Sequence, residues 1–338
     1  MKKVLVMGMG AIGHTIVTSL DDTKAQIDVV TSTPVEIDTI KNNLGDESKV
    51  TNVVTYEMLL ENCDYDIIFL TLPYRHKITR MKQLKDVIKP HTTIVLLPAN
   101  QGAVNYLPKS IQENNPIILS ERVPQISRID EKYKSVNVYG TRRDLMMVGK
   151  NGANPLILSE LIPYMDQLQI LNNEFEISLI SSNAVLHTSR VYNVYANKTE
   201  NYGKEFGFYT EWTEEDGQLL IEMEQEVIEL KEKIEAAENV EIYLYDLFKH
   251  FNIEPLTAAV AKERIGNYEA LSKIRFYAED EADLMTNRYV VDDAVLGIHY
   301  YLELGKKYNV EMPKMEMIYQ WAVDFVKPHV DEVDDLNV

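Results

Sequence analysis

One histidine in the sequence lies in a setting that suits proton transfer. His187 stands in the middle of SSNAVLHTSRVYN, residues 181–193, among several apolar side chains. Asn183 precedes it by four residues, so the two side chains share one face if the stretch is helical. An imidazole beside a carboxamide that orients a ligand can act as a general acid or base. A core histidine bonded to its neighbours produces the same pattern, and the stretch alone favours that structural alternative.

A second chemical signal lies at the N-terminus, where the apolar run of residues 3–7 leads directly into GMGAIG. In a dinucleotide-binding loop, Gly8 would allow the tight turn and Gly10 would let the backbone approach a pyrophosphate. Gly13 would let the following helix pack closely on the strand, with its N-terminus facing the phosphates. The predicted cofactor-binding loop consists of Gly8, Gly10, Ala11, Ile12 and Gly13.

The next predicted strand, residues 26–30, bears on the choice of cofactor. It ends in Thr31, Ser32 and Thr33, where an NAD-selective site usually carries an acidic residue for the ribose. Three hydroxyl groups suit a 2′-phosphate, and Lys41 lies further along the same segment. We therefore favour NADP(H) and retain NAD(H) as the alternative, because Asp28 would serve if the strand ended earlier.

The elements that must hold these residues begin with strand-like runs at the spacing of a doubly wound sheet. The further runs cover residues 49–54, 66–72, 92–97, 117–119, 136–139 and, as an edge strand, 145–148. Leu72 ends the run 66–72, Pro73 follows it and Asn100 follows the run 92–97, at the sheet edge where ligands of open α/β sheets bind. For Asn100 and for Arg75, His76 and Gln101 in the same loops, a solvated loop position is an equal alternative.

The sequence pattern changes at KNGANP, residues 150–155, where Gly, Asn and Pro cluster and the strands stop. We predict a Rossmann-type NAD(P)-binding domain over residues 1–152 and an all-α substrate and catalytic domain over residues 153–338. The predicted helices cover residues 155–170, the stretch around His187, and residues 214–237, 242–251, 292–308 and 315–326.

Composition narrows the class of protein. The 338 residues include 34 basic and 53 acidic side chains, a net charge of −19 that disfavours binding to nucleic acids and to anionic membranes. The single cysteine cannot form an internal disulfide, which fits a reducing cytoplasm. No run approaches the about 18 apolar residues of a membrane span, and no spacing of histidines with cysteines or carboxylates predicts a metal site.

The order of these signals resembles the opine dehydrogenases, the octopine/nopaline dehydrogenase family, over nearly the whole chain. In that family the second domain carries Asn-x-x-x-His, a Phe and Tyr stretch before an acidic helix, and Arg-Tyr-x-x-Glu-Asp-hydrophobic-x-Gly. NAVLH, GFYTEWTEED and NRYVVDDAVLG match these motifs in turn. Asp292 replaces the usual Glu, and Ala294-Val295 replaces the usual hydrophobic-Pro pair.

The resemblance implies that the amine of an amino acid condenses with a 2-oxo acid such as pyruvate, and that NAD(P)H reduces the imine. His187 would be the general acid/base, Asp293 would bond its other nitrogen, and Arg288 would bind the oxo acid carboxylate. Asn183 would be a further substrate-binding residue. An anionic substrate on a chain of net charge −19 needs such a local cation. A helix N-cap at Asp293 and a surface ion pair at Arg288 are the structural alternatives.

Two other functions stay open. A 2-oxo acid reductase resembling ketopantoate reductase would share the N-terminal domain, but that family uses a lysine where this chain offers Asn183 and His187. A nucleotide-binding sensor without turnover would need only the Rossmann domain. The sequence leaves the oligomeric state open, a homodimer included.

Overall fold

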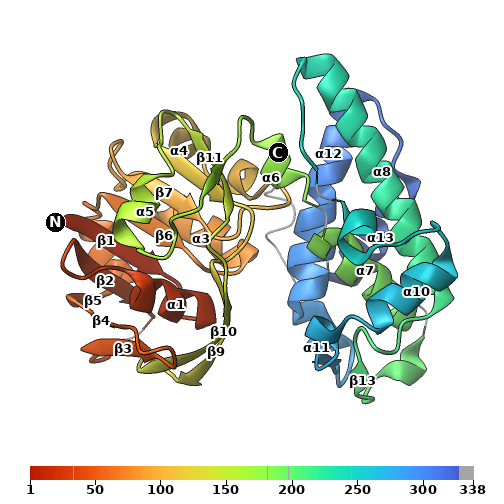
Figure 1. Cartoon of the computed structure of the whole chain (residues 1–338), viewed down its shortest axis with the longest axis horizontal. Helices are drawn as coiled ribbons and strands as arrows, with labels where there is room; N and C mark the ends of the chain where they lie inside the picture. Colours follow the sequence, from red (N-terminus) through yellow and green to blue (C-terminus); the bar gives the residue numbers. More distant parts are fainter. Residues whose placement is uncertain (33, 181, 197, 245, 327–338) are drawn as a thin grey trace. The chain divides into compact units, whose positions relative to one another are not determined.

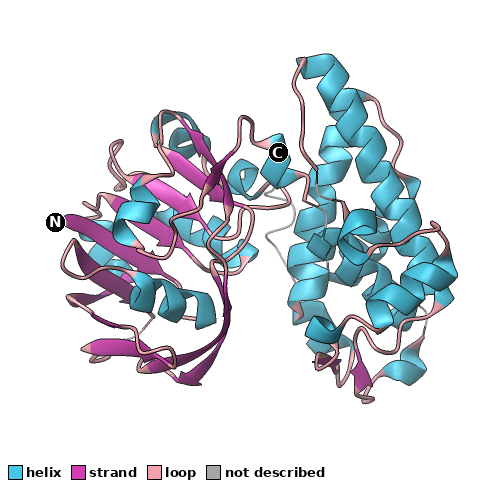
Figure 2. Cartoon of the chain, viewed as in Figure 1, coloured by secondary structure: helices cyan, strands magenta, loops and turns pink. Residues whose placement is uncertain are grey.

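The structure, a computed structural model, describes residues 1–32, 34–180, 182–196, 198–244 and 246–326. The chain forms two compact units, Met1–Ser178 and Leu179–Val338 (Figure 1). Strands build the first unit and helices dominate the second (Figure 2). The predicted fold class, a Rossmann-type α/β domain followed by a helical domain, is confirmed.

The first unit contains an eight-stranded sheet in the order β12-β11-β8-β7-β6-β1-β2-β5. Its strands are β1 (Lys2–Met7), β2 (Ala25–Thr31), β5 (Asn52–Thr55), β6 (Ile67–Leu70), β7 (Thr93–Leu96), β8 (Ile117–Ser120), β11 (Met146–Lys150) and β12 (Gln169–Ile170). The six neighbouring strands β8, β7, β6, β1, β2 and β5 are parallel, whereas β11 is antiparallel to β8. The strand order reverses between β1 and β6, and ligands of such sheets bind at the carboxyl ends beside that point.

Helices pack on the strands of this sheet, and a second sheet packs on one of the helices. The helices of this unit are α1 (Ala11–Ser19), α2 (Tyr56–Glu61), α3 (Tyr74–Leu84), α4 (Lys109–Asn114), α5 (Ile157–Leu161) and α6 (Phe175–Ser178), with a 3₁₀ turn, η1 (Ala103–Tyr106). The second sheet has the order β4-β3-β10-β9 and is formed by β3 (Thr39–Asn42), β4 (Glu47–Lys49), β9 (Gln125–Glu131) and β10 (Ser135–Thr141). It packs on α1, where the Thr15 and Ser127 hydroxyls are 2.8 Å apart.

Several predicted strands differ from the structure. Residues 49–54 are not one strand, because β4 ends at Lys49 in the second sheet and β5 starts at Asn52 in the first. The run 136–139 belongs to β10 and therefore to the second sheet. The predicted edge strand, β11, has β12 on its outer side. These differences arise because strand pairing depends on partners distant in the sequence.

The predicted boundary after residue 152 precedes the division of the structure at Ser178. Only Ile157–Leu161 of the predicted helix 155–170 is helical, and residues 169–170 form β12 of the first sheet. Leu158, Leu161 and Met165 are buried in the core of the first unit beside side chains of β1 and α1. Burial of this apolar segment attaches it to the Rossmann-type unit, although the change in sequence composition occurs earlier.

The second unit contains mostly helices. They are α7 (Ser182–Tyr195), α8 (Glu214–Glu238), α9 (Leu247–Phe251), α10 (Ala258–Gly266), α11 (Glu281–Thr286), α12 (Ile298–Tyr308) and α13 (Pro313–Val326), with 3₁₀ turns η2 (Thr199–Asn201) and η3 (Glu269–Leu271). The prediction of an all-α domain needs one correction, since β13 (Phe206–Gly207) pairs with β14 (Arg275–Phe276). The long helix α8 begins with a capping box between Thr213 and Asp216, which satisfies its first N–H groups.

The segment before α12 is a π-helix, η4 (Tyr289–Gly297). The sequence predicted an α-helix from Asp292, and the wider turn is a feature that single-residue propensities do not reveal. All of residues 290–297 are buried, so η4 forms part of the interior of this unit.

None of the helices in the described ranges combines the length and the apolar composition that a membrane-spanning segment needs.

Candidate active site

The glycine loop joins β1 to α1 and leaves room for a ligand. Gly8 has φ +112°, a conformation that L side chains rarely adopt. A Cβ on Gly13 would lie 1.9 Å from the Gly8 carbonyl oxygen, so glycine is required for this close packing. A Cβ on Gly10, the N-cap of α1, would meet no atom within 4 Å. The first turn of α1, with Ala11 and Ile12, thus begins beside open space that suits a pyrophosphate.

The loop after β6 holds the glycine loop in place. Thr71 Oγ1 donates a hydrogen bond to the carbonyl oxygen of Gly8 at 2.7 Å. Leu72 packs against Gly8, and its backbone nitrogen would lie 2.9 Å from a Cβ there. Pro73 is the N-cap of α3. Thr71 was not among the predicted site residues, although its position directly after a buried strand was a signal for it.

The end of β2 lies where the sequence predicted it. Thr31 is the last residue of the strand and is buried, Ser32 is exposed, and Thr33 lies outside the described residues. Asp28 is three positions earlier in the strand, where its carboxylate accepts hydrogen bonds from Asn52 Nδ2 at 2.8 Å and Tyr65 Oη at 3.0 Å. Asp28 is therefore not the residue at the strand end, and no described carboxylate takes that position in the sheet.

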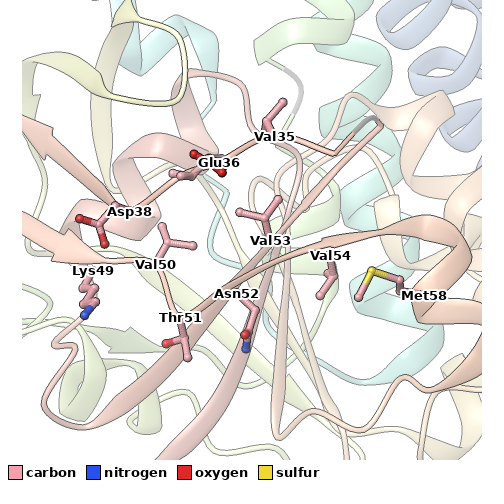
Figure 3. A pocket seen from close by; sticks show the side chains of 11 residues that line it. Val35, Glu36, Asp38, Lys49, Val50, Thr51, Asn52, Val53, Val54 and Met58 are labelled. Atoms are coloured by element: carbon pink, nitrogen blue, oxygen red, sulfur yellow. The ribbon is translucent and has the colours of Figure 1, made fainter.

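An open pocket of about 680 Å³ lies along β5 and the segment that follows β2 (Figure 3). Its lining combines apolar and charged side chains: Val35, Glu36, Ile37, Asp38, Lys49, Val50, Thr51, Asn52, Val53, Val54 and Met58. Val54 pairs with Val30, the neighbour of Thr31, so one end of the pocket lies beside the end of β2. A pocket beside the end of this strand, with valine and isoleucine side chains among its lining, is placed to receive the adenine end of a dinucleotide.

The loop after β7 presents amide groups. Asn100 and Gln101 are 4% and 0% exposed, so their alternative as solvated loop residues is wrong. Asn100 Oδ1 and both amide atoms of Gln101 have no hydrogen-bond partner among the described residues, which is unusual for buried polar atoms and typical of a ligand or water site. In the loop after β6, by contrast, Arg75 is half-buried and His76 is exposed at the start of α3.

The second unit brings His187 and Asp293 together. His187 Nδ1 lies 2.8 Å from Asp293 Oδ2, although the two residues are 106 positions apart. Both residues are buried, at 6% and 3% exposed. Because a carboxylate only accepts hydrogen bonds, Nδ1 carries the proton and Nε2 is left as the acceptor in the neutral ring. Asp293 lies inside η4, so its alternative as a helix N-cap is wrong.

Aromatic residues hold the imidazole on its remaining sides. Tyr289 stacks on the His187 ring with centroids 4.1 Å apart and an interplanar angle of 28°. Phe208 packs edge-on at 5.9 Å. Tyr209 Oη lies 3.0 Å from His187 Nε2. Burial, and to a smaller extent the neighbouring Tyr289 and Asp293, raises the pKa of Tyr209, so its phenol stays protonated and donates this hydrogen bond.

Arg288 supplies a positive charge near this cluster. It is exposed, its guanidinium lies 5.3 Å from the centre of the Tyr289 ring, and it opposes the rise in the pKa of Tyr209. No carboxylate of the described residues forms an ion pair with it, so the alternative of a surface salt bridge is not observed. Asn183 is half-buried one turn before His187 on α7, as the sequence predicted. The arrangement offers a base, a charge partner for it and a nearby cation.

The structure thus groups His187, Asp293 and Arg288 within the second unit, and the glycine loop, Thr31, Leu72, Pro73 and Asn100 at the carboxyl edge of the first sheet. Sequence reasoning assigned no catalytic role to Tyr209 or Tyr289. Their signal was present in the GFYTEW and NRYVVDD motifs, but abundant tyrosines elsewhere in the chain hid it.

Two family models match the chain. The model described as NAD/NADP octopine/nopaline dehydrogenase, alpha-helical domain, matches residues 170–326. The model described as ketopantoate reductase PanE/ApbA matches residues 4–118. No curated protein sequence matches.

Solved structures share the fold at low sequence identity. Octopine dehydrogenase with NADH and pyruvate aligns with a TM-score of 0.77 and 17% identity over 96% of this chain and 89% of that one. Yersinopine dehydrogenase aligns with a TM-score of 0.74 and 12% identity over 99% and 92%. A putative 2-dehydropantoate 2-reductase from Enterococcus faecalis gives 0.60 and 14% over 96% and 98%. At these identities the likeness concerns the fold.

Proposed function

We propose that this chain, whose residues 170–326 belong to the octopine/nopaline dehydrogenase family, is an NAD(P)H-dependent dehydrogenase that condenses an amino acid with a 2-oxo acid. The observation that carries the proposal is the buried hydrogen bond between His187 and Asp293, with Arg288 next to the tyrosine stacked on that imidazole. The fold is shared with octopine dehydrogenase, which was determined with NADH and pyruvate.

In this function His187 moves protons. Its neutral ring carries two protons, one after the other, from the amine nitrogen to the carbonyl oxygen. The first converts that oxygen to the carbinolamine hydroxyl, and the second lets the hydroxyl leave as water, so that the imine forms. Asp293 fixes the tautomer through Nδ1–H and stabilises the imidazolium that exists between each proton uptake and release. Stacking by Tyr289 excludes water from one face of the ring and keeps its orientation.

Arg288 binds the carboxylate of the 2-oxo acid. A guanidinium has paired donors that match a carboxylate, and this one is exposed and has no ion pair among the described residues. On a chain of net charge −19, this local cation also favours the approach of an anionic substrate. Asn183 would add an amide contact to the substrate from the same helix as His187.

The first unit would hold the dinucleotide. Gly10, Ala11 and Ile12 at the N-terminus of α1 would face the pyrophosphate, and the loop with Asn100 would lie at the nicotinamide end. Bound NAD(P)H supplies the hydride that reduces the imine. NADP(H) is favoured over NAD(H), because β2 ends at Thr31 and continues into Ser32, with no carboxylate at either position.

The assay is oxidation of NADPH and of NADH with pyruvate alone, with amino acids alone, and with both, over a panel of amino acids. Turnover that needs both substrates supports the proposal. Turnover with pyruvate or ketopantoate alone would instead indicate the 2-oxo acid reductase that the match of residues 4–118 allows, although α7 carries no lysine. Tight binding of the dinucleotide without any turnover would indicate a sensor.

A further inference from the structure

Both nitrogens of His187 are already occupied in the structure. Nδ1 donates to Asp293, and Nε2, the nitrogen that would exchange protons with a substrate, accepts from the hydroxyl of Tyr209 at 3.0 Å. Tyr289 and Phe208 pack on the ring, and His187 is only 6% exposed. The lone pair that acid/base catalysis requires therefore points at a phenol.

The position of Tyr209 is fixed by its backbone. The neighbouring Phe208, which follows β13 directly, donates its N–H to the carbonyl oxygen of Ile274 at 3.0 Å. The Tyr209 carbonyl oxygen accepts the N–H of Trp212 at 3.3 Å, just before the capping box that starts α8. Tyr209 is 3% exposed and packs on Phe208 with ring centres 4.9 Å apart. A side chain anchored in this way is suited to a defined contact rather than to swinging aside.

We propose that Tyr209 is a catalytic residue that relays protons between the substrate and His187. The inference rests on the proposed function and extends it, because the phenol is the group that Nε2 contacts among the described residues. A phenol oxygen that donates one hydrogen bond still has lone pairs to accept another. Tyr209 can thus bond to His187 and to the amine or hydroxyl of the substrate at the same time.

The transfer balances at each atom. When the amine attacks, its N–H bond breaks and a new O–H bond forms on Tyr209, while the original phenol O–H bond breaks and an N–H bond forms at Nε2 of His187. The phenol stays neutral throughout, and the positive charge appears on the imidazole beside Asp293. The reverse transfer returns this proton to the former carbonyl oxygen, which becomes the carbinolamine hydroxyl. A second round moves the other amine proton to that hydroxyl, which leaves as water while the C=N bond forms. Burial raises the pKa of Tyr209, so a free phenolate is not an intermediate.

The test compares Tyr209→Phe with Tyr195→Phe in the full-length chain. Tyr195 lies in the same unit, is 4% exposed, and its hydroxyl has no hydrogen-bond partner among the described residues. Both changes remove one buried hydroxyl and keep the ring, so Tyr195→Phe measures any general loss of activity from removing a buried hydroxyl in this unit. Each variant is also combined with His187→Ala, and rates are measured in mixtures of H₂O and D₂O.

We expect Tyr209→Phe to lower kcat by about tenfold to a hundredfold, with NAD(P)H affinity and the KM for the oxo acid within about threefold. Tyr195→Phe should stay within about twofold of the wild type. In the His187→Ala background, Tyr209→Phe should have no further effect, because the relay acts only through that imidazole. A plot of kcat against the fraction of D₂O should be curved for the wild type, where two protons move together, and linear for Tyr209→Phe.

Three results would overturn the relay. A kcat within about twofold of the wild type in Tyr209→Phe would remove Tyr209 from the reaction. A lower KM with unchanged kcat would show that the hydroxyl only blocks Nε2. If Tyr209→Phe lowered kcat by the same factor in the wild type and in His187→Ala, Tyr209 would have a structural role. If the wild type fails to oxidise NAD(P)H with every pair of amino acid and oxo acid tested, the proposed function fails and the relay fails with it.

Discussion

The replacement Asp293→Asn tests the charge that supports His187. The carboxylate oxygen lies 2.8 Å from Nδ1 and the pair is buried, so the imidazolium formed during catalysis has an anion in direct contact. Two unit charges about 4 Å apart interact by about 4 kcal/mol at an effective dielectric constant near 20. Because about 1.4 kcal/mol corresponds to a factor of ten in rate, removing the charge costs up to about a thousandfold.

The side-chain amide that replaces the carboxylate would recover part of this interaction, because its oxygen can still accept from Nδ1–H. We therefore expect kcat to fall by about a hundredfold to a thousandfold. The assay is steady-state oxidation of NAD(P)H with pyruvate and the best amino acid from the panel. Asp324→Asn is the matched control, because Asp324 is exposed on α13 and bonds only to Gln320 among the described residues. Thermal unfolding and cofactor binding, followed by fluorescence, should match the wild type in both variants.

A kcat for Asp293→Asn within about threefold of the wild type would refute this reasoning, since the buried carboxylate would then contribute nothing to charge stabilisation. Reduced activity together with a much lower thermal midpoint would also count against it, because the loss would then come from the fold. Equal losses in Asp293→Asn and Asp324→Asn would point to a general effect of net charge.

Four further predictions concern other parts of the chain. His187→Ala should keep NAD(P)H affinity and lose about a hundredfold or more in kcat; an unchanged rate would remove His187 from the mechanism. Thr31→Asp should shift the ratio of kcat/KM values towards NADH, because a carboxylate repels the 2′-phosphate; an unchanged ratio would argue against binding there. Gly10→Ala should weaken cofactor binding with little change in the free energy of unfolding measured in urea. Gly13→Ala should lower that free energy, because the added Cβ would lie 1.9 Å from a carbonyl oxygen; equal free energies for the two variants would contradict this. Burial raises the pKa of Glu226 to about 7, above its value in the unfolded chain. The free energy of unfolding should therefore fall as pH rises from about 5 to about 8, because the folded protein must then release a proton that it binds more tightly. Glu226→Gln should flatten this pH dependence, measured by urea titrations.

The sequence alone was sufficient for features that depend on neighbours along the chain. The glycine loop between β1 and α1 follows from three glycines after a short apolar strand, and α8 follows from its capping residues and apolar periodicity. The end of β2 at Thr31 and the shared helix of Asn183 and His187 follow in the same way. Interactions within a turn or a helix involve residues a few positions apart, so a local pattern carries them.

Tertiary structure decided what meets His187, although the family resemblance had already implied the contact with Asp293. Asp293 is 106 positions away and Tyr209 is 22, and only the packing of the segments that carry them around α7 brings them within hydrogen-bond distance. The same holds for the second sheet, for the attachment of β12 to the first unit and for the burial of Gln101. Such contacts depend on which distant segments exclude water from each other, and no spacing along the chain encodes that directly.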